Sequence, residues 1–266
     1  MSRPTKAAKP DPIAENSIVI ELLDVLKKHN APASEDLKGM IENTAKIEQQ
    51  LATAIAELAA MRRELAAIRE DNHPMRKVLQ NAIIGVQDRI LALRQQLETM
   101  KAAIVDGCEN VLKAFKERGA AALNGLTQFF KVRPALEAIA KSCDQAAKEN
   151  TQTISKIERI SREYHKTGQH LRNIGRAMTG KELITSMKPV GKVAKAAEAP
   201  MKAARACNLA MRDAARDALK SLSRLEKSID RPKLIKEQLN TAAKQAAAYN
   251  ARNAPDKTKT TPAVEL

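Results

Sequence analysis

The chain has 266 residues, a formal net charge of +15, three Phe, two Tyr and no Trp. Most globular cores obtain large buried areas from aromatic side chains, so an interior of Ala, Leu, Ile and Met indicates seams between helices. Because no stretch alternates between apolar and polar residues over a useful length, we expect no sheet. The predicted fold is all-α, with long coiled-coil-type helices forming antiparallel hairpins or an elongated bundle, and with disordered termini.

Cysteine spacing and hydropathy narrow the class of protein and its expected cellular location. Cys108, Cys143 and Cys207 are widely separated and form no CxxC pair, which argues against a disulfide framework and against a thiolate zinc site. The basic start of the chain is not followed by the apolar core of a signal peptide, and no later run approaches the roughly 20 apolar residues of a membrane span. We therefore expect a cytoplasmic protein with reduced thiols.

The first half of the chain predicts a disordered arm followed by coiled-coil helices. Residues 1–16 contain three prolines among polar residues, a composition typical of disorder. Residues 17–133 form a predicted coiled-coil helical region, with a short helix to about residue 29 and a long helix from about residue 35 to 71. The long helix carries two apolar tracks at heptad spacing. These are Leu51, Leu58 and Leu65 on one track and Ile47, Ala54, Met61 and Ile68 on the other.

A break in this pattern predicts a turn between two helices. The string "DNHP" ends at Pro74, whose ring cannot continue the helical ladder and whose predecessor avoids helical angles. The apolar pattern resumes at Leu79, and the four-residue step to Ile83 shifts its register, which indicates either a stutter or a turn. We predict that the helices on either side of Pro74 fold back as an antiparallel hairpin near residues 71–75. Beyond residue 106 the apolar face widens and contains all three phenylalanines, which are Phe115, Phe129 and Phe130.

The second half predicts a basic helical region over residues 134–250, beginning with the longest helix at 134–178. Polar Asn150 and Thr153 lie in the seam of that helix, where a polar residue costs stability but can fix the register. Two apolar tracks run through to the end of the helix. They are Leu136, Cys143, Ile157, Tyr164, Leu171 and Met178 on one track and Ile139, Ala146, Ile160 and Ile174 on the other.

Prolines divide the rest of the basic region. After Gly180 we expect short pieces cut by Pro189 and Pro200, and then a helix over residues 201–230. Pro232 can open a last helix to about residue 250. Residues 251–266 are expected to form a disordered tail.

Several strings of the chain resemble those of one known family. The strings, in this order, are "LLDVLKKHNAPASEDL", "ELAAMRRELAAIREDNHP", "FFKVRPAL", "YHKTGQHLRNIGRAMTGKE" and "KPVGKVAKAAEAPMKAARAC". They are similar to an uncharacterised helical family, of unknown function, carried on conjugative and other mobile elements of anaerobic Gram-positive gut bacteria. The resemblance spans roughly residues 20 to 225. It implies a genetic context and no activity, ligand or functional residue.

One motif must be compared with the phosphate-binding loop of nucleotide-binding proteins. In "GRAMTGKE", Gly175, Gly180 and Lys181 match the spacing of a phosphate-binding loop, but Glu182 stands where Ser or Thr should hold magnesium. A carboxylate there would repel phosphates, and the preceding segment has helical rather than strand spacing. We interpret the motif as a helix end with Gly180 in a left-handed cap.

Other reactive constellations are missing from the sequence. His165 and His170 are five residues apart, so they diverge around a helix, whereas a zinc-binding pair needs a spacing of four. No Ser, Cys or Asp lies in a nucleophile motif. We therefore expect no catalytic residue, no metal site, no cofactor and no small-molecule substrate, and we predict that the protein is not an enzyme.

Charge gives the strongest functional signal. Residues 1–133 carry 20 basic and 17 acidic side chains, whereas residues 134–266 carry 26 and 14. A basic excess of this size attracts polyanions such as nucleic acid, acidic proteins or anionic membrane surfaces. No helix-turn-helix, zinc-finger or aromatic RNA-binding signature accompanies it. The residues predicted to contact a polyanion are Lys188, Lys192, Lys195, Lys202, Arg205, Arg212, Arg216, Lys220 and Arg224.

Three functions follow as hypotheses from these patterns. The heptads, which are the most extensive pattern, favour a helical scaffold or adaptor that binds a protein partner or itself through coiled-coil seams. The basic half favours sequence-independent binding of nucleic acid as an alternative. The apolar face between Phe115 and Phe130, together with the lysines after Met187, favours peripheral association with a membrane as a further alternative. The resemblance adds a role in the transfer or maintenance of a mobile element.

Overall fold

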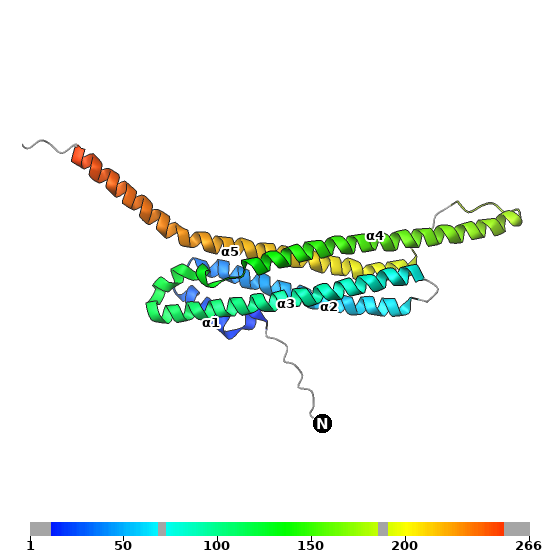
Figure 1. Cartoon of the computed structure of the whole chain (residues 1–266), viewed down its shortest axis with the longest axis horizontal. Coiled ribbons are helices and arrows are strands. Elements are labelled where there is room, and N and C mark those ends of the chain that lie inside the picture. Colours follow the sequence, from blue (N-terminus) through cyan, green and yellow to red (C-terminus); the bar gives the residue numbers. More distant parts are fainter. Residues whose placement is uncertain (1–11, 69–72, 186–190, 253–266) are drawn as a thin grey trace, which may run out of the picture.

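The computed structural model describes residues 12–68, 73–185 and 191–252, and within these ranges the chain forms helices and no strand (Figure 1). The four long helices are α2 (Ala33–Ala67), α3 (His73–Arg118), α4 (Arg133–Met178) and α5 (Lys192–Arg252). A short helix, α1 (Ser17–Lys28), and two 3-10 segments, η1 (Ile13–Glu15) and η2 (Gly119–Phe129), accompany them. The all-α fold class is confirmed.

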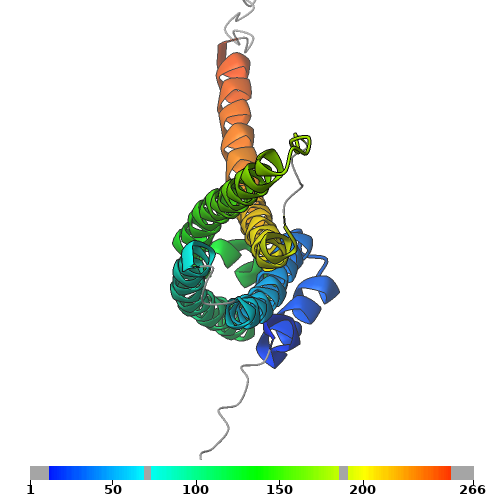
Figure 2. The same ribbon diagram turned by 90° about the vertical axis from the view of Figure 1, so that its right-hand side faces the viewer.

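The long helices run alternately up and down in an elongated bundle, which Figure 2 shows from one end. Side-chain contacts between α2 and α3 show their antiparallel order. Arg62 Nη2 of α2 donates to Gln87 Oε1 of α3 at 2.7 Å. Glu48, fourteen residues before Arg62, pairs with Lys101, fourteen residues after Gln87. The turn predicted near residues 71–75 overlaps residues 69–72, which lie outside the described residues.

The apolar spacing of the sequence identifies the core correctly over most of the bundle. On α2 both predicted tracks are buried from Ile47 to Ile68, except that Leu65 is half-buried. On α3 the four-residue step between Leu79 and Ile83 lies within one continuous helix, so it is a stutter and no turn. Both side chains point into the core. A stutter changes the local supercoil without breaking the backbone ladder.

Helix α5 packs along both α2 and α4, and small side chains allow the close approach. Six of its buried residues are alanines, namely Ala194, Ala197, Ala204, Ala214, Ala215 and Ala218. A Cβ atom added at Gly39 of α2 would lie 3.0 Å from Ser221 Oγ of α5, so the two helices approach each other closely there. The predicted regions 17–133 and 134–250 therefore lie side by side, and their separation into units stays a prediction.

The prediction that Pro200 and Pro232 divide this part of the chain is wrong, because both lie inside α5. A proline in a helix interior removes one backbone hydrogen bond and costs about 3 kcal/mol. At Pro200 tertiary packing offsets that cost. The proline itself is buried, and so are Ala197 and Met201 near it. The break predicted at Pro189 lies outside the described residues.

The segment after Pro12 is ordered, which corrects the expected extent of the N-terminal arm. Ile13 is 1% exposed and packs with the core. Its backbone N–H donates to Glu48 Oε2 of α2 at 3.1 Å. Proline and polar composition predicted disorder, but one apolar side chain and one backbone donor find partners on α2. Residues 1–11 and 253–266 lie outside the described residues.

Two helix ends extend past the rest of the bundle (Figure 1). The last turns of α4, residues 162–178, continue beyond the ends of α2 and α3, and we call this segment the α4 arm. At the opposite end, the last part of α5 leaves the bundle. Ser161 is the last buried residue of α4. At the start of the α4 arm, Tyr164 still borders a hollow with Met75 of α3 and Val193 of α5. Farther along the arm, the apolar track is exposed at Leu171, Ile174 and Met178.

Candidate functional site

The cations predicted to contact a polyanion lie along α5, except Lys188, which is outside the described residues. They divide into two sets according to whether the side chain is paired with an acid. The paired set is Lys202, Arg212, Lys220 and Arg224. The set without an ion pair in the described part of the chain is Lys192, Lys195, Arg205 and Arg216, all exposed.

The cations that recur every four residues from Arg212 to Arg224 wind around the helix instead of forming one stripe. Each four-residue step advances by about 40°, so the first and last lie about 120° apart. Arg212 Nη1 contacts Asp144 of α4 at 3.3 Å, whereas Arg224 Nε contacts Asp36 of α2 at 2.8 Å. Hydrogen bonds from Lys148 and Arg212 hold the pKa of Asp144 below its usual range. The two arginines thus connect α5 to two different neighbours.

Lys202 has a structural role that the sequence did not reveal. Its Nζ donates to Oε2 of Glu198 at 2.7 Å, and the side chain of Glu198 is only 5% exposed. The other carboxylate oxygen, Oε1, has no hydrogen-bond partner in the described part of the protein. The hydrogen bond to Glu198 raises the pKa of Lys202. A substitution at Lys202 therefore changes the surface charge of α5 and also removes the cation that stabilises the buried carboxylate of Glu198.

Three of the unpaired cations share one face of α5. From the helical repeat, Lys195, Arg205 and Arg216 lie within about 80° of one another around the axis and span roughly 30 Å along it. All three are exposed. They form the part of the predicted polyanion surface that no described acidic side chain neutralises. Whether that surface binds a polyanion stays a prediction.

The motif that resembles a phosphate-binding loop ends a helix instead of beginning one. Gly180 has φ +66° and follows the last turn of α4. The N–H of Lys181 donates to the carbonyl of Arg176 at 2.9 Å, and the N–H of Gly180 donates to that of Ala177 at 3.2 Å, which is the Schellman pattern. The predicted left-handed cap is confirmed. A phosphate site needs free N–H groups at a helix N-terminus, and this end presents carbonyls.

The described residues contain no group of three or more His, Cys, Asp or Glu side chains that could hold a metal ion. The three cysteines are free and buried. Burial raises the pKa of the Cys108 and Cys143 thiols to about 12 and also raises that of Cys207.

These thiols are expected to react slowly in the native protein. At pH 8 a thiol with a pKa of about 12 is ionised in roughly one molecule in ten thousand, and the thiolate is the reactive form. Ellman's reagent should therefore modify none of the three cysteines within minutes in buffer and all three in denaturant. Rapid modification of the folded protein would contradict the burial of Cys108 and Cys143.

The α4 arm exposes large apolar side chains at heptad spacing. Tyr164 and Leu171 are each 67% exposed, Ile174 is 59% exposed and Met178 is 84% exposed. We call these four residues the arm stripe. On the same tracks, nearer the start of α4, the apolar residues from Leu136 to Ile157 are buried. The stripe is thus a continuation of a seam past the point where the other helices cover it.

The chain segment that leaves α4 is tied to the opposite side of the arm. Asn173 Nδ2 donates to the carbonyl of Ile184 at 3.0 Å, and Asn173 Oδ1 accepts from the Ile184 N–H at 2.8 Å. Gln169 Nε2 also donates to that carbonyl. Asn173 lies nine residues after Tyr164, or two and a half turns, so the tether and the arm stripe face opposite ways. The returning segment supports the arm and leaves the stripe uncovered.

Several charged residues that hold the bundle together were not identified from the sequence. They are Glu48 with Lys101, Arg89 with Glu149, and Glu198. Glu48 and Lys101 each follow a seam residue directly, so heptad spacing places them at the edge of the core. Charged residues at the edges of a seam are common in any coiled coil, and heptad spacing does not predict which opposite charge each one contacts. Only the packing of α2 against α3 brings these two together.

Comparison with known proteins gives a family and no activity. No helix among the described residues is long and apolar enough to cross a membrane. No curated protein and no solved structure matches the sequence. The model of a family of unknown function, DUF6674, matches residues 15–262, a range that includes all of α1 to α5. The chain therefore belongs to this family of unknown function.

Proposed function

We propose that the protein is a non-enzymatic helical scaffold or adaptor that binds an acidic, helical partner protein through the α4 arm. The arm stripe is the single observation that carries the proposal. Four large apolar side chains at coiled-coil spacing stay exposed on a helix whose earlier heptads are covered. Exposed apolar residues that continue a heptad seam are the usual way in which one helix recognises another.

The charge of the arm favours a foreign partner over a second copy of the chain. The arm, residues 162–178, contains four Lys or Arg and one Glu. Two such arms side by side would place like charges across the seam, which disfavours pairing, whereas an acidic helix would be attracted. The resemblance to proteins carried on mobile elements supports a partner in element transfer or maintenance.

The test compares arm variants in cells that express the protein. In the double variant Leu171→Glu with Ile174→Glu, two carboxylates lie in the seam, so a partner helix should be lost. Affinity purification followed by quantitative mass spectrometry should show one or a few proteins reduced at least tenfold in the variant. Both side chains are exposed, so the circular dichroism spectrum and the melting temperature should stay unchanged.

A matched control is available on another helix. Leu91 of α3 is 57% exposed and lies outside the arm, so Leu91→Glu should retain every partner that the wild type captures. The decisive step is direct binding between the purified candidate and the wild-type protein, with loss in the arm variant only. If the candidate binds wild type and arm variant equally, the arm is not the interface and the proposal fails.

Nucleic-acid binding is a second candidate because three unpaired cations share one face of α5. Replacing Lys195, Arg205 and Arg216 with glutamine should weaken binding of labelled DNA. It should also reduce the slope of log affinity against log salt by about one for each phosphate that the variant no longer neutralises. None of these three side chains holds an ion pair in the described residues, so stability should not change.

The membrane alternative depends on the apolar face from Phe115 to Phe130. Phe130 is buried, and Phe115 is half-buried against the core. An interfacial helix needs an apolar face that is free to enter the headgroup region. These two side chains instead pack inside the bundle, so the membrane alternative has no support comparable to that of the arm stripe.

A further inference from the structure

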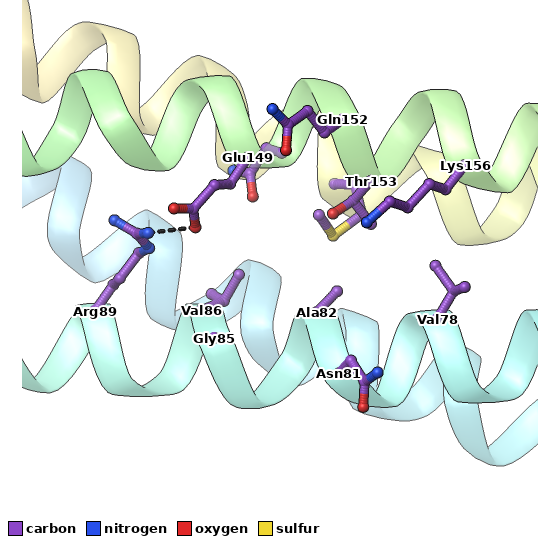
Figure 3. A pocket seen from close by; sticks show the side chains of 12 residues that line it. Val78, Asn81, Ala82, Gly85, Val86, Arg89, Glu149, Gln152, Thr153 and Lys156 are labelled. Carbon is purple, nitrogen blue, oxygen red and sulfur yellow. Dashed lines mark ion pairs between the residues drawn. The ribbon is translucent and has the colours of Figure 1, made fainter.

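A groove of about 250 Å³ opens between the first part of α3 and the middle of α4 (Figure 3). On the α3 side its wall consists of Val78, Ala82 and Val86, which are half-buried apolar side chains. Met201 of α5, itself buried, completes the lining. The groove therefore has an apolar wall that the neighbouring helices cover only in part.

The opposite wall carries polar groups from one side of α4. Asn150, Thr153 and Lys156 follow one another at three-residue spacing, so they lie on the same side of the helix. Asn150 is 4% exposed and its Nδ2 is covered, so the polar groups that can reach a ligand are those of Thr153 and Lys156. Figure 3 shows the ammonium of Lys156 beside Thr153, directed into the space between the two helices.

The charges around the groove leave one positive charge without a partner. Arg89 of α3 and Glu149 of α4 form an ion pair at one end of the groove, so they neutralise each other. Lys156 forms no ion pair with any described residue. The groove thus combines a single available cation, Lys156, with an apolar wall on the opposite helix.

We propose that this groove binds a small amphipathic monoanion, specifically a carboxylic acid with an apolar tail. The carboxylate accepts from Lys156 and Thr153, and the apolar tail lies against Val78 and Val86. The volume is just below that of pockets for drug-sized molecules, which sets the size class.

N-Hexanoylglycine combines a carboxylate with an apolar tail and serves as the probe, with its uncharged glycine amide as the comparison. Titration of the full chain by calorimetry should show saturable 1:1 binding of the acid. The amide should bind at least tenfold more weakly because it cannot pair with Lys156. Lys156→Gln should weaken binding of the acid by a similar factor, whereas Lys141→Gln, an exposed lysine on the same helix outside the groove, should not.

A variant that fills the groove separates loss of binding from loss of fold. A Cβ atom at Gly85, which lines the groove on α3, would meet nothing within 4 Å. Gly85→Leu should therefore occupy the space and abolish binding, while the melting temperature rises because a helix former replaces glycine. Leu171→Glu on the α4 arm should leave binding of the acid unchanged, so this result does not depend on the scaffold proposal.

Three outcomes would overturn the proposal. If the wild-type protein shows no saturable binding of the acid up to millimolar concentration, the groove does not bind this class of ligand. If the acid and the amide bind with equal affinity, Lys156 does not pair with the carboxylate. Binding of the acid to Gly85→Leu with wild-type affinity places any site outside the groove.

Discussion

Replacing Glu48 with alanine should lower the free energy of unfolding by about 2–3 kcal/mol. Glu48 Oε1 lies 2.6 Å from Lys101 Nζ, and the side chains are 19% and 9% exposed. Removing one partner of a buried ion pair typically costs about 3–5 kcal/mol, and the residual exposure of Glu48 lowers that figure. The variant also removes the acceptor of the Ile13 N–H, so the N-terminal turn should loosen. Urea denaturation should show a lower midpoint with little change in slope.

The exposed pair on the same helix provides the control. Glu42 lies 3.8 Å from Lys38, and their side chains are 58% and 55% exposed. Glu42→Ala should therefore change stability by less than about 0.5 kcal/mol. The double variant Glu48→Ala with Lys101→Met should recover part of the loss, since an apolar side chain replaces the buried ammonium. Equal destabilisation by Glu48→Ala and Glu42→Ala would show that burial of the Glu48 pair does not matter.

Lys202→Glu should lower the melting temperature by roughly 5 °C or more, unlike reversal of an unpaired cation on the outer face of α5. The new carboxylate would stand one turn from Glu198, which is buried and already has one oxygen without a partner among the described residues. Two carboxylates at this spacing repel, and the buried one loses the only cation that the described residues place on it. Differential scanning calorimetry at neutral pH measures the effect.

Lys192→Glu is the matched control, because Lys192 is exposed on the same helix, lies six residues from Glu198 and holds no ion pair among the described residues. Its melting temperature should stay within about 1 °C of the wild type. Adding Glu198→Gln to the Lys202→Glu variant should restore most of the loss, since only one carboxylate then remains. A Lys202→Glu protein as stable as Lys192→Glu would mean that Glu198 does not depend on Lys202. If the dependence holds, charge reversals meant to test nucleic-acid binding should avoid Lys202.

Heptad spacing accounts for much of this fold, because the helical repeat fixes which side chains share a face. The tracks from Ile47 to Ile68 and from Leu136 to Ile157 are buried as predicted, apart from half-buried Leu65. The helix end at Gly180 was also predictable, since glycine adopts a left-handed cap without strain. By contrast, Pro200 predicts a break that does not occur, because the gain from packing α5 between two helices outweighs that local signal.

Heptad spacing identifies the apolar face of a helix, but it does not predict which other helix, if any, packs against that face. Leu136 and Leu171 lie on the same track of α4, yet one is buried and the other is 67% exposed, because the α4 arm continues beyond the neighbouring helices. Partners of charged residues depend on the same geometry. Lys202 and Lys195 look alike in sequence, and only the fold leaves Glu198 buried beside the first. Periodicity and composition are thus enough to define most of the core faces, but not the extent of α5. Which stretches of those faces stay uncovered depends on helix lengths and offsets that long-range packing sets.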